Sequence, residues 1–456
     1  MADYKKIENY ISNIATIWHN AGMEASNYVG CMLYVMGLKK MVEENACMNP
    51  EYMSSIVALT KVLYHPTSPS DIDIIRNASR VLEETYHAKE GLFTDVLSTY
   101  RSEEESWKKA FLDIVAATAE IEIDEDGYAP YVQQILYYAS KDGRDKAEKI
   151  SSNAVADLLS IGADIKDGDT VLDGAIGYGY SAMKCIQGKK DIKLYGVDLN
   201  TDALQVSSLY MILCGVDCEM MQEDSTAMGM GGFANKVVMD IPFGMRPRAE
   251  LAGYQLHRAN KWMDSDTCKE MEALFIAAGI DYMEDGGRLV VIVPQRFMFG
   301  QSKALSNFRK NLIKEGLLKA VVALPPVYNS TMINTAMLVI EAGNKDVLFV
   351  DGSMLVTRER RNDAFITDEN KAQLHDILEN RKVVEGISFT VPNAEVMEVG
   401  DWSISRYIDA EEKIELRPIS EINEDLDRCY KRLEELSVQS KNIKLSLNEI
   451  VTASAY

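Results

Sequence analysis

Short apolar runs alternate with longer amphipathic stretches through the middle of this chain, between residues 168 and 345. The apolar runs have the length and continuous hydrophobicity of strands that are covered on both faces. Because helical periodicity separates them, they indicate βαβ units and an α/β fold with a parallel, Rossmann-like sheet, which we assign to residues 141–345. The predicted strands are 170–172, 193–197, 236–239, 288–293, 319–324 and 336–340.

The regions on either side of this core differ from it. Apolar residues such as Ile7, Ile11 and Ile14 recur at helical spacing, so residues 1–140 are predicted to form an all-helical N-terminal domain. Residues 346–415 carry short strand and turn patterns, which we interpret as a C-terminal extension of the core.

The last segment, residues 416–456, predicts a helix. Its apolar positions step alternately by four and three residues, the heptad spacing of a coiled coil or of a helix docked on a partner. A helix that packs on its own domain is the alternative. The stripe consists of Ile422, Leu426, Cys429, Leu433, Leu436, Ile443, Leu447 and Ile450, with Ser440 at the remaining position.

Three predicted strands lead into an acidic residue, at Asp173, Asp198 and Asp240. Ligands of an open α/β sheet bind beyond the carboxyl ends of its strands, so these carboxylates predict one nucleotide-like site. The loop after Asp173 contains Gly177 and Gly179, which adopt positive φ easily and let the backbone approach a ligand. Because the loop is neither G-x-G-x-x-G nor a P-loop, a phosphate cradle is not favoured. A tight strand-to-helix turn without a ligand is the alternative.

Two of these stretches resemble motifs of amino-methyltransferases. The run Asp173-Gly-Ala-Ile-Gly-Tyr-Gly is similar to their S-adenosylmethionine loop, usually (D/N)-P-x-x-G-x-G, and Asp240-Ile-Pro-Phe resembles their (N/D/S)-P-P-(Y/F/W) tetrapeptide. Further runs, which start at Gly287 and Leu317, resemble the modification subunit of type I restriction–modification systems, a family of N6-adenine DNA methyltransferases. The resemblance covers most of the chain.

The resemblance implies S-adenosyl-L-methionine as the cofactor. The glycine loop would hold its amino-acid end, Asp198 its ribose, and Asp224 would lie near its adenine, with an exposed turn acid as the alternative for Asp224. The family's Y-T-P-type motif corresponds to Lys149-Ile-Ser-Ser here, so two serines are further candidates; a simple helix N-cap is the alternative. The cofactor-binding candidates are Asp173, Ala175, Ile176, Gly177, Gly179, Asp198, Asp224, Ser151 and Ser152.

The resemblance also implies catalysis of methyl transfer to the N6 amino group of adenine in DNA, by Asp240, Ile241, Pro242 and Phe243. That nitrogen is a poor nucleophile because its lone pair is delocalised into the ring. Acceptors at the Asp240 carboxylate and the Ile241 carbonyl would shift electron density onto it. Phe243 would stack on a base that has been flipped out of the duplex.

Three positions depart from the family motifs: Gly174 and Ile241 replace prolines of the cofactor loop and the tetrapeptide, and Ser152 stands where the Y-T-P-type motif has its proline. These replacements keep a second hypothesis open, a degenerate and catalytically weak methyltransferase fold that acts as a scaffold or regulatory subunit. Methylation of another planar amino group, in RNA or in a protein glutamine, is a third hypothesis. The heptad stripe and the resemblance over 287–340 favour DNA.

The chain is strongly acidic, with 48 Lys and Arg against 70 Asp and Glu and a net charge of −22. Duplex DNA is held mainly through phosphate contacts from Lys and Arg, so we expect weak DNA binding by this chain alone. The resemblance implies a partner, a sequence-specificity subunit contacted through the C-terminal helix. A second copy of the chain is a further candidate partner.

One polar stretch, residues 244–266, concentrates basic side chains. It is either a loop that faces DNA beside the target base or an ordinary surface loop. Its basic residues are Arg246, Arg248, His257, Arg258 and Lys261.

No apolar run approaches the ~18 residues that span a bilayer, and the N-terminus has no signal region, so we expect a cytoplasmic protein without membrane contact. The seven cysteines lack C-x-x-C spacing and no histidine completes a ligand set, so no metal site is predicted.

Overall fold

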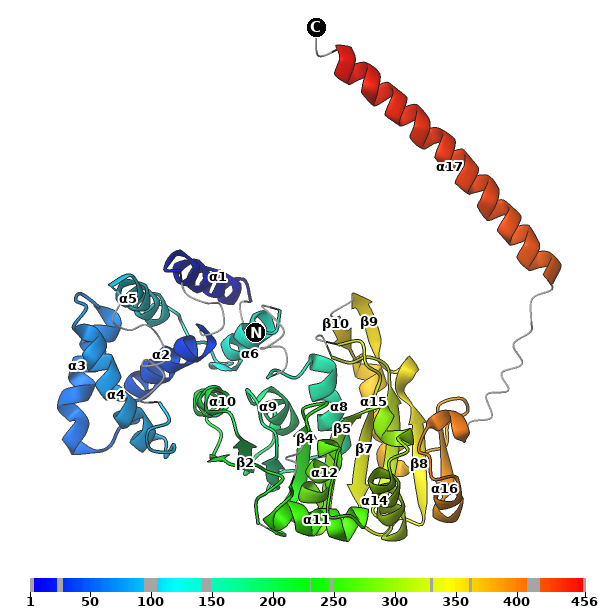
Figure 1. Cartoon of the computed structure of the whole chain (residues 1–456). Helices are drawn as coiled ribbons and strands as arrows, with labels where there is room; N and C mark the ends of the chain where they lie inside the picture. Colours follow the sequence, from blue (N-terminus) through cyan, green and yellow to red (C-terminus); the bar gives the residue numbers. More distant parts are fainter. Residues whose placement is uncertain are drawn as a thin grey trace. The chain divides into compact units, whose positions relative to one another are not determined.

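The computed structural model describes residues 4–22, 28–93, 105–141, 149–229, 231–246, 250–328, 331–360, 363–407 and 419–453 (Figure 1). The chain divides into two compact units, Met1–Ile408 and Asp409–Tyr456. The domain boundaries expected at residues 140 and 345 fall within the first unit and stay predictions. The boundary expected at residue 415 lies outside the described residues.

A nine-stranded sheet forms the centre of the first unit, in the order β11-β8-β6-β7-β5-β4-β1-β2-β3. Each of the six predicted strands is present. Strand β3 was not predicted, and β8 and β11 lie in residues 346–415, where short strands were expected without bounds. The strands are β1 (Thr170–Asp173), β2 (Lys193–Asp198), β3 (Cys218–Gln222), β4 (Ala234–Asp240), β5 (Met283–Pro294), β6 (Leu318–Leu324), β7 (Thr335–Glu341), β8 (Asp346–Asp351) and β11 (Ser388–Pro392). A separate ribbon pairs β9 (Thr357–Arg360) with β10 (Asp363–Phe365).

The sheet is mixed, so the expectation of an all-parallel sheet is wrong for one half of it. Strand β7 runs antiparallel to both of its neighbours, β5 and β6, and β11 runs antiparallel to β8. A parallel connection needs a crossover of a dozen or more residues, usually a helix, and the segment between Leu324 and Thr335 is shorter. The apolar run of β7 does not reveal its direction, because a strand covered on both faces reads the same either way.

Helices cover both faces of the sheet (Figure 1). Successive side chains of each strand point to opposite faces, so Val238 joins one hydrophobic core and its neighbours Val237 and Met239 join the other. The first face is covered by α8 (Asn153–Ala163), α9 (Tyr180–Ile186), α10 (Thr201–Cys214) and α15 (Asp368–Asn380). The second face is covered by α11 (Gly253–Met263), α12 (Met271–Tyr282), α14 (Lys303–Lys314) and α16 (Asn393–Val399), with the short α13 (Arg296–Phe299) nearby.

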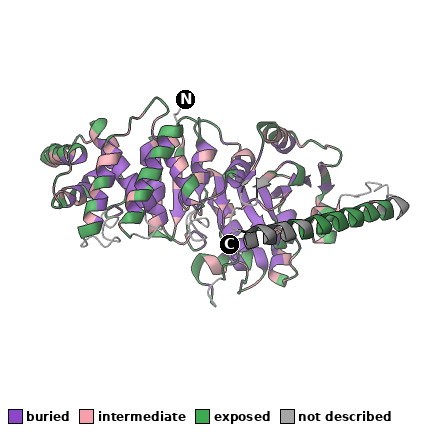
Figure 2. Cartoon of the chain, turned by 90° about the horizontal axis from the view of Figure 1, so that it is seen from above, coloured by how far each residue is buried: buried purple, intermediate pink, exposed green. Residues whose placement is uncertain are grey.

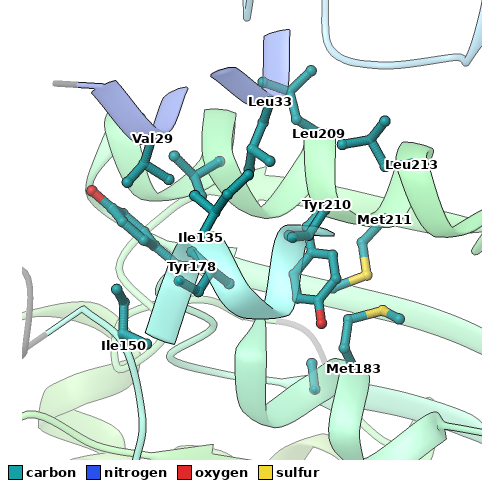
Figure 3. Close-up of a cluster of buried hydrophobic side chains, with 14 of the residues drawn as sticks. Val29, Leu33, Ile135, Ile150, Tyr178, Met183, Leu209, Tyr210, Met211 and Leu213 are labelled. Atoms are coloured by element: carbon teal, nitrogen blue, oxygen red, sulfur yellow. The ribbon is translucent and has the colours of Figure 1, made fainter. Parts of the chain in front are cut away.

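The described part of residues 4–141 is helical, as predicted, and it shares a core with the sheet. Its central helix, α2, is buried along most of its length and packs on α10 (Figure 2). Figure 3 shows Leu33 of α2 beside Leu209 of α10, and Val29 beside Tyr178. The helices are α1 (Tyr4–Asn20), α2 (Tyr28–Glu43), α3 (Met53–Tyr64), α4 (Asp71–Thr85), α5 (Glu105–Ala119) and α6 (Ala129–Ala139).

The predicted C-terminal helix is present as α17 (Ile419–Ala453), and Figure 2 colours most of its described residues as exposed. On the heptad stripe, Leu426, Leu433, Leu436 and Ile443 are 51%, 65%, 49% and 61% exposed. The side chains of Ile422, Leu447 and Ile450 lie outside the described ones. Across the described ranges, no helix is both long and apolar enough to cross a bilayer.

Candidate active site

A cavity of about 430 Å³ opens at the carboxyl ends of β1, β2 and β4. The loops after β3 and β6 close its sides. Motifs that are far apart in the sequence therefore share one space, and two of the three acidic strand ends, Asp198 and Asp240, line it. Its lining includes Gly174, Ala175, Gly177, Asp198, Leu199, Asn200, Asp224, Asp240, Ile241, Pro242, Phe243 and Tyr328.

The glycine loop between β1 and α9 is shaped by the segment packed behind it. Gly177 has φ +52°, and a Cβ atom there would lie 2.6 Å from the backbone oxygen of Lys149. The N–H of Tyr178 donates to that same oxygen at 3.0 Å. Gly179, with φ +79°, precedes the first residue of α9, Tyr180. Glycine is therefore required at 177 for backbone conformation and for space, whether or not a ligand is bound.

Asp198, at the end of β2, is held toward this loop. One carboxylate oxygen accepts from the N–H of Gly177 at 3.0 Å and the other from the N–H of Asn200 at 2.8 Å. Because each carboxylate oxygen can accept two hydrogen bonds, both oxygens retain acceptor capacity. Asp198 lines the cavity, so it can bind a pair of ribose hydroxyls.

Asp224 lines the same cavity from the loop after β3. One carboxylate oxygen accepts from the Thr226 backbone at 2.9 Å and from the Thr226 hydroxyl at 2.6 Å, and the Gln255 amide donates to the other at 3.3 Å. Gln255 belongs to α11, so the second helical layer fixes the position of this carboxylate.

The basic stretch 244–266 contributes to this loop through Arg258. This side chain is 1% exposed, and it donates to the backbone oxygens of Thr226 and Met228 and to Asp281. The interpretation as a DNA-facing side chain is therefore wrong for Arg258, because its guanidinium is buried and donates its hydrogen bonds to groups within the protein. Arg246, His257 and Lys261 are exposed, and Arg248 lies outside the described residues.

Asp173 lies beneath the cavity wall instead of in it. The side chain is 1% exposed, and one oxygen accepts from the N–H of Ala175 at 3.0 Å. Burial, helped by the nearby Asp240 and Asp198 carboxylates, raises the pKa of Asp173 to about 7. Ile176 and Gly179 are likewise outside the cavity lining. Of the predicted loop residues, Ala175 and Gly177 are the ones that reach the cavity.

The tetrapeptide forms the other end of the cavity. Asp240 accepts hydrogen bonds from the Ser151 hydroxyl on one carboxylate oxygen and from the Tyr328 hydroxyl on the other, both at 2.5 Å. Burial raises the pKa of Asp240, and the two hydroxyl donors oppose that rise. The ring of Phe243 lies edge-to-face with Tyr328, with centroids 5.2 Å apart.

Tyr328 was not recognised as a site residue from the sequence. The stretch from 317 to 340 contains it, but nothing local links it to Asp240. The available signal was an aromatic residue just beyond Pro325-Pro326, where β6 ends at the same edge of the sheet as β4.

The two candidate serines have different surroundings. Ser152 is the N-cap of α8, accepting from the N–H of Val155 at 3.2 Å, and its hydroxyl donates to the Val327 carbonyl at 2.6 Å. Ser151 contacts Asp240 instead. Neither lines the main cavity; both line a smaller neighbouring one of about 190 Å³. The N-cap alternative thus describes Ser152, and direct cofactor binding by either serine stays a prediction.

Gly174 and Ile241, which stand where the family motifs have prolines, occupy tightly packed positions. A Cβ atom at Gly174 would lie 2.4 Å from the terminal methyl of Met239, so this methionine fills the space beside the loop. Ile241 is 2% exposed and joins the second core, whereas Pro242 is exposed. Packing of the Ile241 side chain thus takes part in fixing the tetrapeptide where a proline ring is missing.

The cavity suits S-adenosyl-L-methionine. Its volume is in the usual range for small-molecule sites, and a glycine loop forms one wall, where no side chain blocks a close approach. The carboxylates around it favour a ligand with positive charge, as a sulfonium and an ammonium group provide. Among the described residues, no group of His, Cys, Asp and Glu could hold a metal ion.

The fold of this chain resembles that of proteins of known structure. The chain is similar to the methyltransferase subunit of the type I restriction–modification system from Streptococcus thermophilus, with a TM-score of 0.70, 16% identity, and coverage of 89% of this chain and 99% of that one. A chain from a structure on complex assembly of a type I restriction–modification system gives a TM-score of 0.64 at 16% identity, covering 97% and 99%.

Sequence comparison adds a curated relative, the type II restriction enzyme and methyltransferase RM.BcgI from Heyndrickxia coagulans. It is 26% identical over 328 residues, which are 62% of this chain and 48% of that protein. The chain thus spans about half the length of this relative.

The family model of the N-6 DNA methylases matches residues 125–415, more than half of the chain. The matched range includes the glycine loop, the acidic strand ends and the tetrapeptide that meet at the cavity. The chain therefore belongs to the N-6 DNA methylase family, a family of S-adenosylmethionine-dependent methyltransferases.

Proposed function

We propose that this protein methylates the N6 amino group of adenine in DNA, as the cytoplasmic modification subunit of a type I-like restriction–modification complex. The observation that carries the proposal is the shared cavity: Asp198 lies at one side of it and the Asp240–Phe243 tetrapeptide at another. The family match and the fold of type I methyltransferase subunits support the same activity.

The chemistry asked of this chain is mainly positioning. S-adenosylmethionine, when bound, supplies an electrophilic methyl group on a sulfonium. The loop at Gly174–Gly177 and the Asp198 carboxylate would orient it. The Asp240 carboxylate and the Ile241 carbonyl would accept hydrogen bonds from the adenine amino group, which directs the nitrogen lone pair to the methyl carbon. The N–C bond forms as the S–C bond breaks, and the negative charge of Asp240 would stabilise the positive charge that grows on nitrogen until the extra amino proton passes to solvent.

The target base would have to leave the duplex to reach this cavity. Phe243 lines the cavity next to Asp240, so its ring is available to stack on an extruded base. With a net charge of −22, the chain is poorly suited to hold DNA by itself, which favours a role within a complex. The exposed heptad stripe of α17 would contact the sequence-specificity subunit.

The test is transfer of a labelled methyl group to plasmid adenine by the full chain, purified with the specificity partner that accompanies it. The wild-type complex should methylate, and Asp240→Ala should reduce the rate by at least about 100-fold. Calorimetry should find that Asp240→Ala keeps its cofactor affinity, whereas Asp198→Ala binds the cofactor at least about tenfold more weakly.

Two results would contradict the proposal. A complex that binds cofactor and DNA without methylating adenine would be the degenerate scaffold that the replaced prolines left open. Methyl groups recovered in RNA or in protein, and not in DNA, would keep the cofactor assignment and change the substrate.

A further inference from the structure

Asp240 accepts hydrogen bonds from two hydroxyl groups that come from distant parts of the chain. Ser151 donates to one carboxylate oxygen and Tyr328 to the other, each at 2.5 Å. These donors are 89 and 88 residues from Asp240 in the sequence, on the segment before α8 and on the loop after β6. A carboxylate has acceptors on both oxygens and no donor, so a hydroxyl on each oxygen satisfies it symmetrically.

The two donor segments are themselves tied together. The Ser152 hydroxyl donates to the carbonyl of Val327 at 2.6 Å, which links the start of α8 to the loop that carries Tyr328. Arg358 donates to the carbonyls of Pro326 and Tyr328 at 3.2 and 3.3 Å. The two segments that carry the hydroxyls are therefore held in place by hydrogen bonds to each other and to Arg358.

We propose that Tyr328 and Ser151 are positioning residues that hold the Asp240 carboxylate in the orientation needed to accept the substrate amino group. The inference rests on the proposed function, and it assigns this chain a device in place of the missing tetrapeptide proline. Each oxygen of Asp240 uses one acceptor position for a hydroxyl, which leaves the other for the substrate. The hydroxyls therefore orient the carboxylate without occupying it fully.

The same hydroxyls govern the charge of Asp240. Burial raises its pKa, and the hydrogen bonds from Ser151 and Tyr328 lower it, because they favour the ionised form. The pKa of Tyr328 is raised well above its usual value, so this hydroxyl stays a donor at all working pH values. Loss of either hydroxyl should raise the pKa of Asp240. As the pH falls, the Asp240 carboxylate would then become protonated at a higher pH than in the wild type. The other charged groups at the cavity are Lys149, Asp173, Asp198, Glu223 and Asp224.

Tyr328→Phe is the sharpest test, because it removes the hydroxyl and keeps the ring that packs on Phe243. Ser151→Ala tests the second donor. Tyr34→Phe is the matched control: it deletes a buried tyrosine hydroxyl that donates to the Ile75 carbonyl at 2.8 Å in the N-terminal helices. All variants are studied in the full chain with its specificity partner.

Tyr328→Phe and Ser151→Ala should each lower kcat by about tenfold to 100-fold, as expected for loss of a hydrogen bond to a charged group, with little change in KM for the cofactor. The acidic limb of the kcat profile should move to higher pH in both variants. Tyr34→Phe should leave kcat and the pH profile unchanged. Wild-type kcat and an unshifted profile in Tyr328→Phe would overturn the inference, and a faster variant would mean that the hydroxyl blocks Asp240.

A titration without turnover separates this inference from the proposed function. Infrared spectroscopy follows the carboxyl band of Asp240 in an Asp173→Asn background, and Asp240→Asn in that background identifies the band. Suppose that the Asp240 band titrates at higher pH in Tyr328→Phe while the wild-type protein methylates nothing. That result would contradict the proposed function and still support the role of the two hydroxyls in holding Asp240. An unshifted band in a protein that does methylate adenine would support the proposed function and contradict the role of the hydroxyls.

Discussion

At the scale of single residues, burial raises the pKa of two carboxyl groups at the site, Asp173 and Asp240. Asp173 is the extreme case. Its side chain is 1% exposed and receives one hydrogen bond from the backbone of Ala175, and its neighbours Asp240 and Asp198 are also acidic. Its pKa of about 7 exceeds the 3.8 of a free aspartate, because burial disfavours the charged form. Such perturbed groups cluster where a protein binds or transforms a ligand.

This residue makes the stability of the protein depend on pH. A carboxyl group whose pKa is raised in the folded state stabilises the fold at low pH, and that stability is lost as pH rises from about 4 to about 7. Asp173→Asn removes the titration. We expect the variant to match the wild type at pH 4 and to exceed its free energy of unfolding by roughly 4 kcal/mol at pH 8, measured by urea unfolding.

Asp164 provides a control of opposite sign. Burial opposes its ionisation, but Lys166 and His375 lower its pKa to about 2, so its stabilising effect is present above the pKa of an unfolded aspartate. Asp164→Asn should therefore lower the urea midpoint at pH 8 and leave it nearly unchanged at pH 2. An Asp173→Asn variant that is less stable than the wild type at pH 8 would contradict the account of burial.

At the scale of elements, α17 carries a row of exposed apolar side chains. Its stripe positions lie on one side of the helix, and Leu433 is 65% exposed. Heptad stripes of this kind pack into a partner helix with knobs in holes.

Leu433→Glu should abolish assembly with the specificity subunit, because a carboxylate would enter the apolar seam. Val438→Glu is the matched control, since Val438 is also exposed, at 53%, but lies on the opposite side of the helix. Co-purification or analytical ultracentrifugation measures assembly, and calorimetry should find cofactor affinity intact in both variants. Equal loss of assembly in the two variants would mean that the stripe is not the contact.

At the scale of the whole molecule, charge is the dominant property. The formal net charge is −22, whereas a duplex is held through the release of counterions by Lys and Arg contacts to phosphate. The buried Arg258 further reduces the basic side chains available on the stretch 244–266. A function on DNA therefore requires basic surface from elsewhere in an assembly.

We expect the chain alone to bind a DNA duplex more weakly than about 10⁻⁵ M at physiological salt. The complex with the specificity subunit should bind far more tightly, with an affinity that falls as salt rises. Fluorescence anisotropy over a salt series measures both, with the partner alone as the reference. Tight, salt-sensitive binding by the isolated chain would mean that the folded protein gathers its basic residues on one surface.

Much of this fold could be predicted from local patterns. A run such as Val237-Val238-Met239 predicts a strand because it is apolar on both faces, and the acid that follows it predicts a ligand edge. Strand β3 escaped prediction because its pattern is weaker: it is half-buried and contains Glu219 and Gln222. The antiparallel direction of β7 depends on its connection and not on its composition.

The sequence by itself determined the strands with acidic ends, the helical N-terminal region, the heptad stripe and the acidic balance, because each depends on residues that are neighbours along the chain. Tertiary structure decided which groups meet. It placed Asp173 beneath the cavity, turned Arg258 inward, and brought the hydroxyls of Ser151 and Tyr328 to Asp240. These contacts join segments that are distant in sequence, and they follow from strand order and helix packing, which no local periodicity encodes.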